Sequence, residues 1–261
     1  MASADTVGYY GRDSTPSDPM DSKAFWDRVF SHGQDSAYSR IDVPAEEDAV
    51  LNAAIQHFGD VANKTVIDLG CGSGKAALFF AKRGARVIAI DQSDVAIENL
   101  SAFCAAQRIS NLQLALVSAL DVATLGPADF VFGSMILHHI EPFDAFTRAL
   151  RDVLPIHGRA FFWENNASSK LLIWFRQNLV GKLWVPKCGD DEEFPLTPGE
   201  IEVLRRHFTV RVVYPELFYF RLISQYLIRG RLEGPFKFLD RVFYRWPWFR
   251  KRSYRQYVYL S

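Results

Sequence analysis

The sequence predicts an α/β fold built on a doubly wound, mostly parallel sheet of seven strands. Strands and helices alternate regularly between about residues 46 and 165, and a glycine-rich turn follows the first strand. Two further β-forming runs lie near the C-terminus. Alternation at this spacing is typical of a parallel sheet with helices on both faces, which binds its ligands beyond the carboxyl ends of the strands.

The strands are expected where short β-branched or aromatic runs lie between turn residues. They are residues 65–69, 86–90, 112–117, 128–133, 159–164, 210–214 and 256–260. The helices are expected where apolar residues recur at helical spacing, and Ser93 is placed to cap one of them. They are residues 24–30, 46–58, 75–83, 95–107, 143–153, 168–183 and 198–208.

The composition fits one large globular domain. The chain has 261 residues, of which 49% are hydrophobic and 23% are charged, and its formal net charge is zero. A sizeable core is therefore available, and attraction of the whole molecule to a polyanion is not expected. The three cysteines are far apart and form no CxxC pair, so we expect neither a metal site nor a disulfide framework.

The two ends of the chain differ from its centre. No basic segment followed by an apolar run opens the sequence, and no apolar stretch reaches about 18 residues, so we expect a cytoplasmic protein.

Residues 1–45 are expected to form an N-terminal arm with a helical lid. Residues 46–261 are expected to form a single domain, with substrate-side insertions at about 166–198 and 217–255, the second a helical insertion before the last strand.

The turn after the first strand lies in the segment Val66–Gly74, which reads VIDLGCGSG. Gly70, Gly72 and Gly74 permit positive φ and leave no side chain between the backbone and a ligand. The N-terminus of the next helix adds N–H groups and a partial positive charge. Asp91 ends the second strand, where a carboxylate can accept hydrogen bonds from ribose hydroxyls. This order of features predicts a nucleoside-containing ligand rather than a turn that binds nothing.

Asp68 narrows the choice of ligand. Its carboxylate lies in the strand just before the turn, where it disfavours a pyrophosphate and suits a cationic amine. Lys75 and Ala76 follow Gly74, so the GxxxxGK[ST] pattern of a P-loop is absent. S-adenosylmethionine has an ammonium, a sulfonium and a ribose but no phosphate, and it is the cofactor that these residues predict.

The segment Val66–Gly74 resembles motif I of the class I S-adenosylmethionine-dependent methyltransferases, the seven-stranded Rossmann-like group. The resemblance covers about residues 45 to 165, and it implies that this part of the chain holds the cofactor. The residues that it places around the cofactor are Asp68, Gly70, Cys71, Gly72, Gly74, Asp91, Gln92, Ser118, Ala119 and Ser134.

The same resemblance implies a role for several of these residues. Asp68 would orient the methionine end, Asp91 would bind the ribose, and Gln92 would lie beside the adenine. The third strand departs from the family pattern, because many members have an acidic residue after it that holds the adenine amino group. Here Ser118 stands at that position, and Asp121 lies three residues further on. Either Ser118 takes the role or Asp121 reaches back.

The fourth strand and the loop after it, residues 128–140, resemble the D-x-V-x…L-H-H loop of small-molecule methyltransferases, such as those of quinone and natural-product pathways. They do not resemble the Asn/Asp-Pro-Pro-Tyr/Phe loop of amino-methylating nucleic-acid enzymes. The resemblance implies that His138 or His139 faces the acceptor, and we favour His139. The alternative is that both histidines only cap or pack.

A methyl acceptor that is a hydroxyl benefits from a base, whereas an amine or an acidic enol needs none. The candidates are His139, His138 and Glu164, which ends the fifth strand and has the alternative role of a hydrogen-bonding loop residue. Tyr9 and Tyr10 lie on the N-terminal arm, and related enzymes often close their site with an aromatic lid. The alternative for these tyrosines is a tail without that role.

Residues 217–255 combine many aromatic side chains with an excess of basic ones. Three interpretations stay open. The segment can cover the active site as a lid, which we favour. It can lie on an anionic membrane surface at the inner membrane face or serve a lipid-like acceptor. It can also contact a nucleic-acid backbone, which is the least favoured partner.

The sequence therefore predicts an S-adenosylmethionine-dependent methyltransferase that acts on a small-molecule acceptor, lipid-like or of natural-product type, at oxygen or carbon. No metal is expected. The alternatives are a nucleic-acid methyltransferase and a protein that binds S-adenosylmethionine without transferring its methyl group, because a fold does not fix a function.

Overall fold

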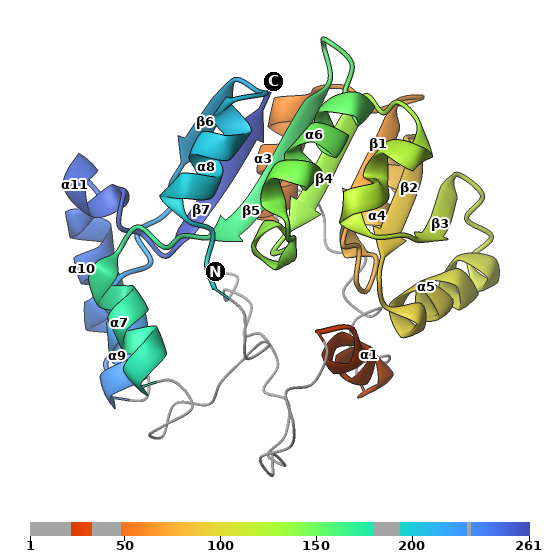
Figure 1. Ribbon diagram of the computed structural model, residues 1–261. Helices are drawn as coiled ribbons and strands as arrows, with labels where there is room; N and C mark the ends of the chain where they lie inside the picture. Colours follow the sequence, from red (N-terminus) through yellow and green to blue (C-terminus); the bar gives the residue numbers. More distant parts are fainter. Residues whose placement is uncertain (1–21, 33–47, 180–193, 229–230) are drawn as a thin grey trace.

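The computed structural model describes residues 22–32, 48–179, 194–228 and 231–261. Within them, seven strands form one sheet in the order β3-β2-β1-β4-β5-β7-β6 (Figure 1), which confirms the expected fold class. The strands are β1 (Thr65–Leu69), β2 (Arg86–Asp91), β3 (Leu112–Leu116), β4 (Phe130–Ser134), β5 (Arg159–Asn165), β6 (Val210–Val213) and β7 (Arg255–Leu260).

The first five strands pair in parallel, and β7 lies antiparallel between β5 and β6. The strand order reverses between β1 and β4, because β2 and β3 lie on one side of β1 while β4 and β5 lie on the other. Such a switch point leaves a crevice at the carboxyl ends of the two central strands, where ligands of open α/β sheets bind.

The helices follow the expected pattern with small shifts at their ends, except that residues 180–183 of the expected helix 168–183 lie outside the described residues. They are α1 (Ser22–His32), α3 (Ala49–Phe58), α4 (Lys75–Lys82), α5 (Asp94–Ala106), α6 (Phe143–Val153), α7 (Lys170–Leu179), α8 (Pro198–Arg205), α9 (Phe220–Ile228), α10 (Glu233–Phe243) and α11 (Pro247–Arg250), with the 3-10 turns η2 (Ala119–Leu125) and η3 (Leu137–His139). The Ser93 side chain caps α5 as expected, since its Oγ accepts from the backbone N–H of Ala96.

Most strands differ from the expectation by one residue at one end, and the start of the fourth strand differs by two. The fourth strand begins at Phe130 rather than Ala128, because the two residues before it use other hydrogen-bond partners. The N–H of Ala128 donates to the carbonyl of Val153 at 3.0 Å, and the Asp129 carboxylate accepts from the N–H of Thr65 at 2.8 Å. The Asp129 side chain thus ties the start of β1 to the start of β4.

Helices cover both faces of the sheet, as Figure 1 shows, and each face has its own apolar core. Because side chains alternate along a strand, Val131 points into the core that contains Phe146 of α6, while its neighbour Phe132 points into the core that contains Phe80 of α4. The ring of Phe132 lies 5.5 Å from that of Phe80 and 5.9 Å from that of Phe161, measured between centroids.

Helices α7, α9, α10 and α11 form a smaller unit beside β7 (Figure 1), with its own cluster of buried residues around Leu172 and Leu222. The buried carboxylate of Asp240 holds this unit together. It accepts from three backbone N–H groups at the start of α9 and from Nε of Arg221, at 2.8–3.2 Å. Among the described helices, none is long and apolar enough to span a bilayer.

We predict that Phe132→Ala lowers the free energy of unfolding by about 3–5 kcal/mol, because the substitution leaves a cavity between two well-packed rings. Phe132→Leu, which keeps most of the volume, should cost under about 1.5 kcal/mol. Urea unfolding followed by circular dichroism measures both values. A loss below about 1 kcal/mol for the alanine variant would contradict the packing of this core.

Candidate active site

The expected site residues gather at the carboxyl ends of β1, β2, β4 and β5. The glycine turn follows β1, Asp91 ends β2, the histidine loop follows β4, and Glu164 lies near the end of β5. These strands surround the switch point in the sheet. The topology therefore brings together residues that are up to about a hundred positions apart in the chain.

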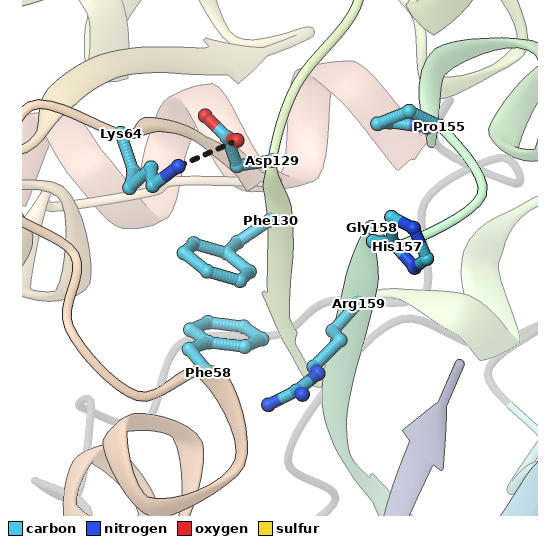
Figure 2. A pocket seen from close by; sticks show the side chains of 8 residues that line it. All are labelled: Phe58, Lys64, Asp129, Phe130, Pro155, His157, Gly158 and Arg159. Carbon is cyan, nitrogen blue, oxygen red and sulfur yellow. Dashed lines mark ion pairs between the residues drawn. The ribbon is translucent and has the colours of Figure 1, made fainter.

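A pocket of about 190 Å³ lies at the other end of the strands, away from the glycine turn. Figure 2 shows its lining from the amino ends of β1, β4 and β5, with Phe58 stacked on Phe130 and Lys64 facing Asp129. The Lys64 Nζ lies 3.5 Å from Asp129 Oδ1, and Arg159 donates to the carbonyl of His57 at 2.6 Å. Because the full length of the strands separates this pocket from the glycine turn, it is not part of the candidate site.

The glycine turn is tightly held by its own backbone. Gly74 N–H donates to the Cys71 carbonyl at 2.8 Å, and Cys71 N–H donates to the Ile90 carbonyl at 2.9 Å. Gly70 and Gly74 have φ of +67° and +79°. A Cβ at Gly70 would lie 2.6 Å from the Ile136 side chain, and one at Gly74 would lie 2.4 Å from Leu100. Any other residue would therefore be both strained and crowded.

Asp91 faces the turn from the end of β2. Its Oδ2 accepts from the N–H of Gly72 at 2.8 Å, and its Oδ1 accepts from the N–H of Ser93 at 3.0 Å. Burial raises the pKa of the Asp91 carboxyl, and the backbone donors partly offset that rise. The carboxylate is thus fixed in place by the backbone, with acceptor capacity left for a ligand hydroxyl.

Asp68 lies behind the turn and is 2% exposed. Its Oδ2 is buried and has no hydrogen-bond partner among the described residues. Burial raises the pKa of Asp68 to about 7, with the negative charge of Asp91 adding to the rise and the Ala77 N–H opposing it. A buried carboxylate oxygen without a donor is costly, and a ligand that supplies an N–H or a positive charge removes that cost.

The residues expected at the adenine end also meet. The Gln92 side-chain amide donates to Ser118 Oγ at 3.3 Å, and the same oxygen caps η2 by accepting from the N–H of Leu120. Ala119 begins η2 and is nearly buried. The turn η2 therefore fixes the position of Ser118 beside Gln92. The apolar periodicity did not predict this turn. Asp121 lies on its exposed side.

The loop after β4 turns sharply at Met135, whose φ is +57°. A left-handed backbone is uncommon for a residue other than glycine and is often found at functional sites. The turn directs the N–H groups of Ile136 and Leu137 onto Oε1 of Glu164, at 2.8 and 2.7 Å. Ser134, at the end of β4, lies just before this turn and is half-buried.

Glu164 also holds one of the two histidines. Its Oε2 lies 2.6 Å from Nδ1 of His138, and both side chains are almost completely buried, at 0% and 1% exposure. The ring of His139 lies 4.2 Å from the His138 ring and makes an edge contact with Trp26 at 5.9 Å. The Glu164 carboxylate therefore binds one histidine, and the second histidine lies against the N-terminal helix.

Helix α1 packs on α5 and adds residues to the site that the sequence did not single out. Ser93 Oγ donates a short hydrogen bond to the Asp27 carboxylate. Lys23 Nζ lies 2.9 Å from Asp27 and 2.7 Å from Asp94 at the start of α5. These contacts fasten α1 beside Asp91.

Two aromatic rings of α1 cover the neighbouring backbone. The Phe30 ring would lie 3.1 Å from a Cβ at Gly72, and it stacks on Trp26 at 5.9 Å. The helical spacing of Trp26 and Phe30 is visible in the sequence, but the surface that they cover is not, because it depends on tertiary packing. Tyr9 and Tyr10, the aromatic residues proposed from the sequence, lie outside the described residues.

The arrangement fits S-adenosylmethionine. The glycine turn offers backbone without side chains, Asp91 offers a fixed acceptor for ribose hydroxyls, and the unpartnered oxygen of Asp68 offers a partner for a cationic group. Burial raises the pKa of the Cys71 thiol well above its usual range, so Cys71 contributes to the turn as a small apolar residue. No cluster of three or more potential metal ligands occurs among the described residues.

Comparison with known proteins agrees with this assignment. Residues 66–158 match the family described as a methyltransferase domain. A curated relative from Acinetobacter baylyi, named ubiquinone biosynthesis O-methyltransferase, is 26% identical over 157 residues, which are 58% of this chain and 65% of that protein. A protein of the same name from Neisseria meningitidis serogroup C is 25% identical over 177 residues, 66% of this chain and 74% of its own length. The first match spans just under two thirds of that relative.

Solved structures share the fold at lower identity. The crystal structure of a SAM-dependent methyltransferase from Aquifex aeolicus covers 86% of this chain and 96% of its own, at 15% identity and a TM-score of 0.52. That of geranyl diphosphate C-methyltransferase from Streptomyces coelicolor A3(2) covers 94% and 98%, at 15% identity and a TM-score of 0.56. Residues 66–158 thus match a methyltransferase domain, and the chain shares the seven-stranded fold of these solved S-adenosylmethionine-dependent methyltransferases.

Proposed function

We propose that this protein transfers the methyl group of S-adenosylmethionine to an oxygen or carbon atom of a small, lipid-like acceptor. The observation that carries the proposal is the adjacency of two parts of the site. The cofactor turn with Asp91 lies at the end of β1 and β2, and the loop with His138 and His139 lies at the end of the neighbouring β4.

Methyl transfer from a sulfonium is an in-line displacement, so the protein must mainly align the reactants and exclude water. S-adenosylmethionine supplies the methyl group when it is bound. Asp68 would hold its ammonium, Asp91 its ribose, and Gln92 with Ser118 its adenine. The aromatic residues of α1, Trp26 and Phe30, would act as a lid that excludes water, and Tyr9 and Tyr10 remain proposed as additional lid residues.

We assign different roles to the two histidines. His138 is buried against Glu164, so we regard these two as positioning residues that fix the conformation of the loop. His139 is the residue that we propose to face the acceptor and to accept a hydroxyl proton. Its proximity to Trp26 supports this choice, because α1 also contacts Gly72 of the cofactor turn.

The acceptor class rests partly on the relatives. Two proteins similar to this chain are named for O-methylation in ubiquinone biosynthesis. A lipid-like acceptor would also give the aromatic segment 217–255 a role, because such an acceptor resides in a membrane. The protein would then act at the membrane surface, at the inner face if the protein is cytoplasmic. We include peripheral membrane contact in the proposal for this reason.

The proposal is tested with the full-length protein, labelled S-adenosylmethionine and a panel of phenols and catechols with and without isoprenoid tails. Transfer of the label to a tailed ring supports the proposal. Transfer to RNA or DNA, or binding of the cofactor with no transfer to any compound of the panel, contradicts it.

We predict that cofactor binding releases a proton near neutral pH. In the ligand-free fold Asp68 has a pKa of about 7 against an ordinary value of 3.8. The stability that its protonated form contributes is therefore present below about pH 4 and is lost as pH rises through about 7. A cationic ligand favours the ionised form, so affinity should increase between about pH 6 and pH 8.

Calorimetry in buffers of different ionisation enthalpy measures this proton release. Asp68→Asn should bind the cofactor more weakly and lose the buffer dependence, whereas the exposed control Asp60→Asn should behave as the parent protein. Equal proton release by the parent and Asp68→Asn would refute the role of this carboxylate.

For a hydroxyl acceptor, we predict that His139→Ala lowers kcat about 10²–10⁴-fold while cofactor affinity stays within error, because only proton removal is lost. The acid limb of the pH–rate profile should disappear with it. Glu164→Gln should keep that limb, although with a lower rate, since it disturbs the loop and not the base. An unchanged acid limb in His139→Ala would exclude His139 as the base.

A further inference from the structure

The described residues between Leu227 and Trp248, which run from the end of α9 through α10 into α11, expose an unusual set of side chains. Five large apolar residues are 47–64% exposed: Leu227, Leu232, Phe238, Trp246 and Trp248. Basic residues lie between them along the chain, and Lys237, Arg241 and Arg245 are all exposed. We call these eight residues the aromatic-basic face.

The inner side of α10 determines which residues face outward. Phe243 packs on Phe220 and Phe249, with ring centroids 5.1 and 4.6 Å apart, and Asp240 is buried in its hydrogen bonds to α9. Because a helix turns by about 100° per residue, Lys237, Phe238 and Arg241 then lie on the other side. Arg245, two residues after the end of α10, is also exposed. Packing thus fixes the exposed side of α10.

The charge of the aromatic-basic face is strongly one-sided. Of the acidic residues in its helices, Asp240 is buried and forms an ion pair with Arg221 at 3.1 Å, which leaves Glu233 as the exposed acid of the described part. Lys237, Arg241 and Arg245 form no ion pair with any described residue. The guanidinium of Arg252 lies 3.6 Å from the centre of the Trp248 ring, so a cation and an aromatic ring meet there as well.

We propose that the aromatic-basic face docks on the surface of an anionic lipid bilayer. Tryptophan and phenylalanine are favoured at the boundary between headgroups and acyl chains, and lysine and arginine pair with the headgroups of anionic lipids. Monomeric soluble proteins seldom group large apolar side chains on one exposed surface without a partner.

Two other partners fit the same residues less well. A nucleic acid offers phosphates and stacking surfaces for the aromatic rings, but it gives no environment to the aliphatic Leu227 and Leu232. A second copy of the chain would place equal basic residues against each other across a two-fold interface, which costs free energy. A bilayer satisfies the aliphatic, aromatic and basic side chains together.

The face is also linked to the candidate active site. The side-chain amide of Asn166, two residues after Glu164, donates to the carbonyls of Lys251 and Ser253 at 3.2 and 2.8 Å. The end of α11 is therefore tied to the end of β5. Docking would hold the acceptor side of the sheet near the bilayer, which extends the proposed function to acceptors that partition into lipid.

Vesicle sedimentation with the full-length protein tests the proposal. Vesicles of phosphatidylcholine alone are compared with vesicles that also contain phosphatidylglycerol. We expect binding to the anionic vesicles that weakens as salt is added. The triple variant Lys237→Glu, Arg241→Glu, Arg245→Glu should lose more than about tenfold in affinity. A second variant, Phe238→Ala with Trp248→Ala, should weaken binding at every salt concentration.

The matched control is Lys82→Glu, Arg86→Glu, Arg108→Glu, which reverses the same number of exposed charges far from the aromatic-basic face, near β2 and β3, and should bind as the parent does. Thermal unfolding and cofactor affinity check that each variant is folded. Absence of binding to anionic vesicles, equal loss in the control, or preferential binding to RNA would overturn the proposal. The proposal deepens the membrane contact in the proposed function. Because this assay needs neither cofactor nor acceptor, its outcome is independent of whether the protein transfers a methyl group.

Discussion

The candidate site depends on one buried carboxylate, that of Glu164. It accepts from two backbone N–H groups and from His138, and so it connects β5 to the loop after β4. Burying a charged group costs little free energy when donors fill its hydrogen-bond capacity. Removing one donor leaves an unpaired buried oxygen and destabilises the fold. The left-handed conformation of Met135 directs the N–H groups of Ile136 and Leu137 at this carboxylate, and the resulting hydrogen bonds stabilise that conformation. The position of His139 follows from that fixed turn.

The cofactor side relies on a different principle. Asp91 is held by the N–H groups of Gly72 and Ser93, so its orientation is set before any ligand arrives. Asp68, in contrast, keeps an unpartnered oxygen and a raised pKa. The Asp91 carboxylate would fix the position of the ligand. The Asp68 carboxylate would favour binding, because a cationic ligand removes the free-energy cost of its unpartnered oxygen. Asp68 lies just before the glycine turn, and Asp91 binds the turn from the end of β2. The glycine turn and these two carboxylates thus define the candidate binding site.

The sheet and the cofactor turn could be predicted from sequence because they depend on local patterns. The strand Thr65–Leu69 and the capping role of Ser93 are examples, since β-branched runs and capping residues act over a few positions. The placement of α1 could not be predicted, because its contact with Gly72 depends on tertiary packing. Glu164 is a candidate from the sequence alone, but its three hydrogen bonds depend on the turn at Met135, and no sequence rule predicts a left-handed methionine.

The attachment of α1 has a consequence for turnover. The helix is fastened to the start of α5 by the ion pair between Lys23 and Asp94, which is partly open to solvent, and by the hydrogen bond from Ser93 to Asp27. If product can leave only when α1 moves away, these contacts set a barrier to release. Ions in solution compete with such contacts within a Debye length. If the protein has the proposed activity, its turnover would then follow the ionic strength of its surroundings through the rate of product release.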